Sequence, residues 1–175
     1  LHGLKELPNL MREVLSEQEK ISEIATELAP AKKYWAIVGN GLNIVAAKEI
    51  RIKLSELCYK SIAADFTEDK KHIDLSAEPM ILVCAAGLEG SVAADAAKEV
   101  AIYRAHKATP VVITDTPEVF SSALKVIEVP SATKELAFIL STMAGHIFGY
   151  EAALSIDAQA TPFREIRSAI ELAVA

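Results

Sequence analysis

Glu49, Lys53 and Glu56 are spaced i, i+4 and i+7 in a segment whose apolar residues predict a helix over residues 42–59. Side chains at these spacings project from one face of a helix. Two carboxylates and an ammonium group on one face can act together. The same spacing suits a solvated face, because Glu four residues before Lys is the favourable order for a surface pair. The spacing alone leaves both interpretations open.

A glycine turn, Gly39-Asn40-Gly41, comes directly before this helix and after a short apolar run. Glycines at such a turn let the backbone approach a ligand and present helix amides to an anion. A dinucleotide-binding fingerprint would continue with a third glycine at position 44, which is Ile44 here. We therefore expect no nicotinamide or flavin cofactor, and the alternative role of the glycines is a tight strand-to-helix turn.

Two further places could carry chemistry. His72 lies in a polar stretch, where a histidine can exchange protons near neutral pH. The glycine-containing stretch 84–91 is where an α/β sheet would hold a phosphate, but it offers only the hydroxyl of Ser91, and Glu89 would repel an anion. We predict a structural loop at 84–91 and a packed helix residue at His146.

Short apolar segments alternate with helical ones along the chain. Parallel strands need crossover connections, which are nearly always right-handed and place helices on both faces of the sheet. We therefore predict an α/β fold with three αβα layers around a five-stranded parallel, doubly wound sheet. The predicted strands are 34–38, 61–64, 80–84, 111–114 and 126–129, and the predicted long helices are 42–59, 92–105 and 133–155.

The remaining segments complete a single predicted domain over residues 1–175. Two short helices are expected in the N-terminal segment 1–30, with Pro8 in a first helical turn and a capping box at 16–19. A polar loop is expected over 65–78, and a tail over 156–175 that Pro162 divides and a short helix ends. Ligands of such sheets bind outside the carboxyl ends of the strands, so the loops after Val38, Ala64, Cys84 and Thr114 are the expected location of a site.

The composition excludes several classes of partner. A formal net charge of −6 argues against a surface for nucleic acid or anionic membrane, both of which require clustered positive charge. Cys58 and Cys84 stand apart without the spacing of a metal or redox site, so we expect no metal and two buried thiols in a reducing cytoplasm. No stretch approaches the ~20 apolar residues of a membrane span.

Together these pieces resemble the carboxyl-terminal sugar isomerase (SIS) domain of the glutamine:fructose-6-phosphate aminotransferase family, which makes glucosamine 6-phosphate. The most specific part is ungapped and runs from Gly39-Asn40-Gly41 through Glu49 to Lys53-Leu54-Ser55-Glu56 and Tyr59. The segment 162–168 of the tail is also similar. The resemblance covers nearly the whole chain and implies the SIS fold.

The resemblance also implies roles for individual residues. Glu56 corresponds to the general base that moves a proton between the first two sugar carbons, and Lys53 to its neighbour on the helix. His72 matches the family's ring-opening histidine, which reaches into the partner subunit's active site. Arg167 stands where the family has a lysine that contacts the open sugar, and its permanently charged guanidinium cannot form an imine. The substrate-binding residues implied are Gly39, Asn40, Gly41, Glu49 and Arg51.

Other departures from the family pattern are Ile50-Arg51, in place of Gly-Ala, and Ile73-Asp74, in place of Gly-Pro. The resemblance implies a sugar phosphate ligand, a homodimer, a companion SIS domain that grips the phosphate, and a glutaminase domain that supplies ammonia. The chain begins with Leu1, and we expect it to be part of a longer protein with two SIS domains. Alone, it is predicted not to make glucosamine 6-phosphate.

Two alternative functions remain open from the sequence. A related enzyme could cleave amino acids from sugar phosphates, with Arg51 and Arg167 binding a substrate carboxylate through bidentate contacts. A non-catalytic module could instead sense a sugar phosphate or mediate dimerisation, which the weak phosphate loop at 84–91 permits.

Overall fold

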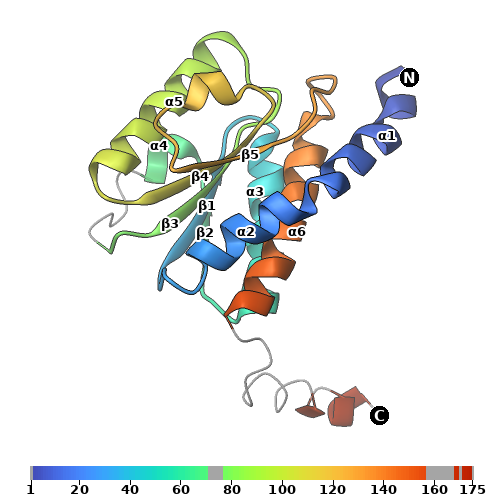
Figure 1. The fold of residues 1–175 in the computed structure, drawn as a ribbon, viewed down its shortest axis with the longest axis vertical. Coiled ribbons are helices and arrows are strands. Elements are labelled where there is room, and N and C mark those ends of the chain that lie inside the picture. Colours follow the sequence, from blue (N-terminus) through green and yellow to red (C-terminus); the bar gives the residue numbers. More distant parts are fainter. Residues whose placement is uncertain (1, 71–76, 157–167, 170, 175) are drawn as a thin grey trace.

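The computed structural model describes residues 2–70, 77–156, 168–169 and 171–174, and its centre is a five-stranded parallel sheet (Figure 1). The strand order is β2-β1-β3-β4-β5. The predicted strands are confirmed, with boundaries that differ by no more than two residues. The strands are β1 (Trp35–Gly39), β2 (Ala63–Asp65), β3 (Met80–Cys84), β4 (Thr109–Thr114) and β5 (Lys125–Glu128).

Helices cover both faces of the sheet, which confirms the three αβα layers. One face carries α1 (His2–Ser16), α2 (Gln18–Leu28), α3 (Asn43–Cys58) and α6 (Ala137–Ser155). The other carries α4 (Thr67–Lys70), α5 (Gly90–Ala105) and the 3-10 helix η1 (Pro117–Phe120). Residues 168–169 and 171–174 are helical, in agreement with the predicted terminal helix, whereas Pro162 lies outside the described residues.

Strand β3 shows why the central strands are continuously apolar. Met80, Leu82 and Cys84 pack into the core beneath α3 and α6, and Ile81 and Val83 pack into the core beneath α5. All five side chains are buried. A strand covered on both faces cannot alternate polar and apolar residues, which explains the continuous run.

Helices α3 and α6 approach each other closely because α6 carries glycines at the contact. A Cβ atom on Gly145 would lie 2.3 Å from Cδ1 of Ile50, and one on Gly149 would lie 2.5 Å from Cδ1 of Leu54. Ile50 and Leu54 are fully buried. This packing fixes the rotation of α3 about its axis and therefore decides which of its side chains face outward.

The N-terminal helices differ from the prediction in two details. Pro8 lies inside α1 rather than in its first turn, because the helix begins at His2, and Leu7, before Pro8, already packs on the core. The predicted capping box is also wrong. The hydroxyl of Ser16 donates a 2.6 Å hydrogen bond back to the carbonyl of Glu13, and the N-cap of α2 is Glu17, without a side-chain cap.

Two loop boundaries also differ. The predicted polar loop 65–78 contains α4, whose Thr67 is buried against neighbouring elements. Helix α6 begins at Ala137 rather than at residue 133, because the segment before it forms a turn in which Leu136 donates to the carbonyl of Thr133.

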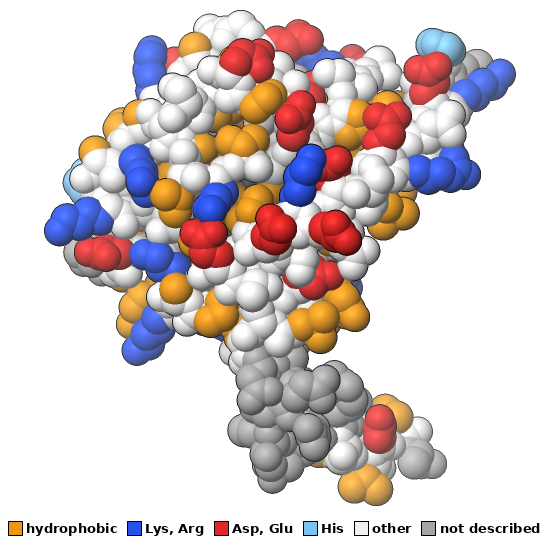
Figure 2. Space-filling view, viewed as in Figure 1, with side chains coloured by type: hydrophobic (Ala, Val, Ile, Leu, Met, Phe, Trp, Pro, Cys, Tyr) orange, Lys and Arg blue, Asp and Glu red, His pale blue; other side chains and the backbone are white. Residues whose placement is uncertain are grey.

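The face of the molecule over α2 is acidic. Figure 2 shows a row of Asp and Glu side chains crossing this face, and the exposed residues Glu19, Glu23 and Glu27 follow one another along α2 at four-residue spacing. This row agrees with the negative net charge and leaves no basic track for a phosphate backbone on this face. Across the described residues, no helix has the length and apolar character needed to cross a membrane.

Candidate functional site at the carboxyl edge and on helix α3

A cavity of about 180 Å³ opens at the carboxyl edge of the sheet, between the turn that follows β1 and the loop that follows β3. In the observed strand order, the connections from these two strands run to opposite faces of the sheet, and ligands of doubly wound folds bind at this switch point. The predicted location of a site is thus matched by an opening. Lining residues include Asn40, Gly41, Leu42, Gly87, Leu88, Glu89, Val92, Lys134 and Phe138.

The two glycines of the turn are required by backbone geometry. A Cβ atom on Gly39 would lie 2.4 Å from the backbone oxygen of Asn43, at the start of α3. Gly41 has φ of +56°, a conformation that side chains disfavour, and it lines the cavity. The structural reading of the glycine turn is therefore correct, and Gly41 is also placed where a ligand could approach.

Asn40 and Asn43 use their side-chain amides to hold neighbouring loops. Asn40 donates a 2.7 Å hydrogen bond to the Thr67 hydroxyl and accepts one of 3.2 Å from the Thr67 amide. Asn43 is buried, donates to the carbonyl of Ala86 at 2.8 Å and accepts from the hydroxyl of Ser141 at 2.9 Å. The rim of the cavity is therefore held by hydrogen bonds from three directions. Sequence reasoning missed Asn43 and Ser141.

Glu49, Lys53 and Glu56 share the outward face of α3, as their spacing predicted. Nζ of Lys53 lies 3.3 Å from Oε2 of Glu56, and the Glu56 side chain is 61% exposed. Neither residue lines the cavity at the carboxyl edge. In the described chain the pair is a solvent-facing one, so a site at Glu56 would need a second surface to exclude water.

The structure separates the predicted residues into two groups. Glu56 lies thirteen residues after Asn43 on α3, which corresponds to about 20 Å along the helix axis at ~1.5 Å per residue. The glycine turn is at one end of this helix and Glu56 near the other. Arg51 is two residues from both Glu49 and Lys53, so it projects from a different side of the helix.

Glu49 lies between these groups and faces His146 of α6. Its Oε1 is 3.4 Å from Nε2 of His146. Both residues line an apolar groove of about 420 Å³ between α1, α3 and α6, together with Met11, Val45, Phe138, Ile139, Thr142 and Met143. The prediction that His146 is a packed helix residue is only partly correct, because its side chain is 40% exposed and contacts a carboxylate.

His72 and Arg167 lie outside the described residues, as do the departures Ile73 and Asp74. Ser91 is exposed in the first turn of α5, and Glu89, in the loop after β3, lies 3.9 Å from Nζ of Lys134 at the cavity. Among the described residues, no group of three or more His, Cys, Asp or Glu side chains is arranged to hold a metal ion.

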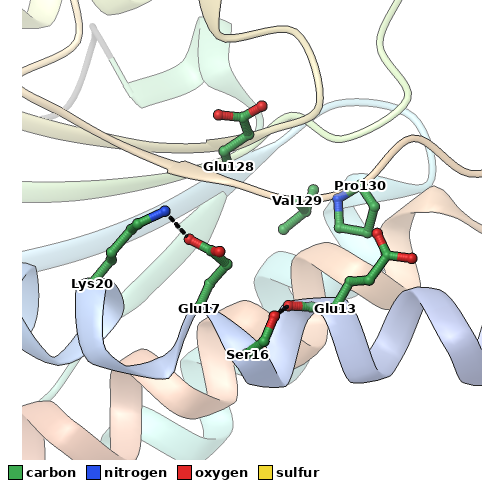
Figure 3. Close-up of a pocket in the computed structure, with 7 residues that line it drawn as sticks. All are labelled: Glu13, Ser16, Glu17, Lys20, Glu128, Val129 and Pro130. Carbon is green, nitrogen blue, oxygen red and sulfur yellow. Dashed lines mark hydrogen bonds and ion pairs between the residues drawn. The ribbon is translucent and has the colours of Figure 1, made fainter.

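A further groove, of about 340 Å³, lies between the α1–α2 junction and the end of β5 and contains none of the predicted residues (Figure 3). The carboxylates of Glu13, Glu17 and Glu128 line it with Lys20. The hydrogen bond and charge of Glu17, with the charge of Glu128, raise the pKa of Lys20. The charges in this groove partly neutralise one another.

Comparison with solved structures identifies the fold. The chain superposes on the C-terminal domain of glucosamine-fructose-6-phosphate aminotransferase from Francisella tularensis with a TM-score of 0.77 and 19% identity, over 87% of this chain and 44% of that one. It also matches the sugar isomerase domain of an RpiR transcription factor from Sphaerobacter thermophilus, with a TM-score of 0.68 and 13% identity, over 94% of this chain and 97% of that one. The chain folds as a sugar isomerase (SIS) domain.

Other comparisons agree with an SIS domain. Tagatose-6-phosphate ketose/aldose isomerase from Escherichia coli matches with a TM-score of 0.69 and 19% identity, over 85% of this chain and 42% of that one. Among curated relatives, glutamine–fructose-6-phosphate aminotransferase [isomerizing] 2 from Bos taurus is 29% identical over 160 residues, or 88% of this chain. The SIS domain spans only 23% of the length of that relative. No protein-family profile matches the chain.

Proposed function

We propose that this SIS domain is the isomerase half-site of a cytoplasmic enzyme similar to glutamine:fructose-6-phosphate aminotransferase, which converts fructose 6-phosphate into glucosamine 6-phosphate. The Bos taurus relative, which carries that activity in its name, supports the proposal. Because the chain spans under a quarter of that relative, the proposal includes a companion SIS domain and a glutaminase domain in the full-length protein.

The observation that carries the proposal is the contact between Lys53 and Glu56 on an outward helix face. Conversion of a ketose imine into an aldose amine moves one proton from the first carbon to the second, while the hydroxyl of the first carbon loses a proton and the imine nitrogen gains one. A carboxylate can take that proton from the first carbon and return it to the second, and so ends the reaction in its original state. In the proposal Glu56 is this base, and Nζ of Lys53 lies 3.3 Å from its carboxylate.

The remaining proposed residues complete the site from elsewhere. His72 of a partner subunit would open the sugar ring, and Arg167 would contact the open sugar with its fixed positive charge. Glu49 and Arg51 would bind substrate from α3. The contacts proposed for Gly39, Asn40 and Gly41 would be made at the other end of this helix, about 20 Å from Glu56. Since Glu56 is 61% exposed in the single chain, the proposed pocket requires cover from a second subunit or domain.

We propose a homodimer for this reason. The apolar groove between α1, α3 and α6 supports it, because exposed apolar surfaces of this kind are commonly buried by protein partners. Sedimentation of the purified chain measures its mass in solution and so distinguishes a dimer from a monomer. Val45→Lys, in the groove, is expected to weaken a dimer, whereas Leu15→Lys, at an equally exposed apolar position on α1, is not. A monomer at all concentrations would contradict it.

The test of the enzymatic proposal is Glu56→Gln in the full-length protein. Removal of a general base is expected to lower kcat by about 10²- to 10⁴-fold with retained substrate binding. The matched control is Glu23→Gln, which removes an exposed carboxylate from the outer face of α2. Unchanged turnover in the Glu56 variant would refute the assignment. The purified chain alone is expected to show no turnover.

A second candidate function is a non-catalytic module that senses a sugar phosphate. It is favoured by the match to the sugar isomerase domain of a transcription factor, which covers 97% of that chain. Under this function, Glu56→Gln would leave ligand affinity almost unchanged. Binding of a sugar phosphate with no turnover by the full-length protein would favour the sensor.

A further inference from the structure

The carboxylate of Asp115 joins two loops at the carboxyl edge of the sheet. Asp115 directly follows β4, and its Oδ1 accepts a 2.8 Å hydrogen bond from the backbone amide of Gly87, in the loop after β3. Its Oδ2 accepts a 3.1 Å hydrogen bond from the hydroxyl of Ser131, in the segment between β5 and α6. Both oxygens of the carboxylate are therefore engaged inside the chain.

The two donors are of the kind that bind phosphate in other proteins. Backbone amides of a glycine-containing loop before a helix, together with a hydroxyl, form concave anion sites. Here Gly87 lines the 180 Å³ cavity and precedes α5, but its amide already points to the Asp115 carboxylate. Asp115 thus occupies the position that an external anion would take.

The loop is also held in this position by packing. Gly87 has φ of +71°, and a Cβ atom there would lie 2.6 Å from Cβ of Ala137. The loop therefore sits directly on the first turn of α6. Little space remains for Gly87 to turn its amide away from Asp115 toward a ligand.

The charges around the cavity also disfavour a bound anion. Glu89 lines the cavity, and the ammonium group of Lys134 that could attract an anion lies 3.9 Å from it. An incoming phosphate would therefore meet the Glu89 carboxylate beside this ammonium group, and a Gly87 amide already bonded to Asp115. Like charges repel each other, more strongly where water is excluded.

We propose that Asp115 is a specificity-determining residue, which serves as the internal anion of the β3–α5 loop and thereby makes the cavity reject phosphate. The cavity volume agrees with a partial ligand, since pockets for whole small molecules measure ~300–1,000 Å³. The inference rests on the proposed function only where the ligand is a sugar phosphate, whose phosphate end would then bind elsewhere.

The experiment follows the Gly87 amide by ¹⁵N NMR while inorganic phosphate is added, with chloride at equal ionic strength as the reference. In the unmodified chain, phosphate and chloride are expected to give the same spectrum. In Asp115→Ala, which frees both donors and removes a charge, the Gly87 signal is expected to shift saturably, with an affinity for phosphate higher by about tenfold or more. Asp115→Asn keeps an oxygen for Gly87 and is expected to gain less.

Two results would overturn the proposal. One is a saturable phosphate-dependent shift of Gly87 in the unmodified chain. The other is a folded Asp115→Ala variant with no gain in phosphate binding, and Asp115→Ser replaces it if the alanine variant does not fold. The titration uses inorganic phosphate and reads no turnover, so its outcome is separate from that of the Glu56→Gln assay.

Discussion

The buried amide of Asn43, at the start of α3, accepts a 2.9 Å hydrogen bond from the hydroxyl of Ser141 on α6. The same amide donates to the carbonyl of Ala86, so one side chain links the helix after β1, the loop after β3 and the last long helix. The rim of the carboxyl-edge cavity therefore depends on a residue outside the recognisable pattern of the family.

Replacement of this amide is expected to destabilise the fold. Asn43→Ala leaves the carbonyl of Ala86 and the hydroxyl of Ser141 without their partner, at a cost of about 1–3 kcal/mol in the free energy of unfolding. Urea denaturation measures this loss in the free energy of unfolding. Ser141→Ala and the double variant complete a cycle, in which additive effects would show that the two residues do not act together.

The glycines at positions 41 and 87 are expected to differ in their tolerance of alanine. Both have positive φ, which costs a non-glycine residue ~1–2 kcal/mol. An added Cβ meets nothing within 4 Å at Gly41, but lies 2.6 Å from Ala137 at Gly87. In urea denaturation, Gly87→Ala should therefore lower the free energy of unfolding by about 1–3 kcal/mol more than Gly41→Ala does. Equal losses would contradict the close packing of this loop.

The chain is expected to lose stability in alkali. Burial raises the pKa of the Cys58 thiol from 9.0 to about 11 and raises those of Cys84 and Tyr103 as well. The unfolded chain therefore releases these protons first, so stability is fully present below pH 9 and is lost as the pH rises toward 11 and above. Cys58→Ala is expected to reduce the slope of unfolding free energy against pH. Cys84 and Tyr103 are expected to maintain part of this slope. An identical slope would exclude Cys58 as a contributor.

The proposed catalytic pair is expected to be dispensable for stability. Lys53 and Glu56 are 42% and 61% exposed, and surface pairs contribute ~0–1 kcal/mol. Lys53→Gln and Glu56→Gln should therefore change the unfolding free energy by less than about 1 kcal/mol. The pair Asp95–Lys98 on α5, with the same spacing and a 3.4 Å contact, provides the matched reference. A much larger loss at Glu56 alone would indicate a structural role.

The fold was predictable because its signals are local. A continuous apolar run such as Met80 to Cys84 identifies a strand covered on both faces, and the i, i+4, i+7 spacing identifies the shared face of Glu49, Lys53 and Glu56. Both signals lie within one element and depend only on strand or helix geometry. Pro8 shows the limit of such signals, because packing of α1 on the core overrode its preference for a first turn.

The partners of the functional side chains were decided only by the tertiary structure. Asn43 meets Ser141 across 98 residues of sequence, Asp115 meets Gly87 across 28, and Glu49 meets His146 between two different helices. Hydrogen bonds and charge pairs of this kind form between groups that the topology brings together, and neither residue of a pair carries a local signature of the other. The sequence could therefore name the helix face that carries Glu56, while the separation of that face from the cavity and the occupation of the loop by Asp115 follow from how the elements pack.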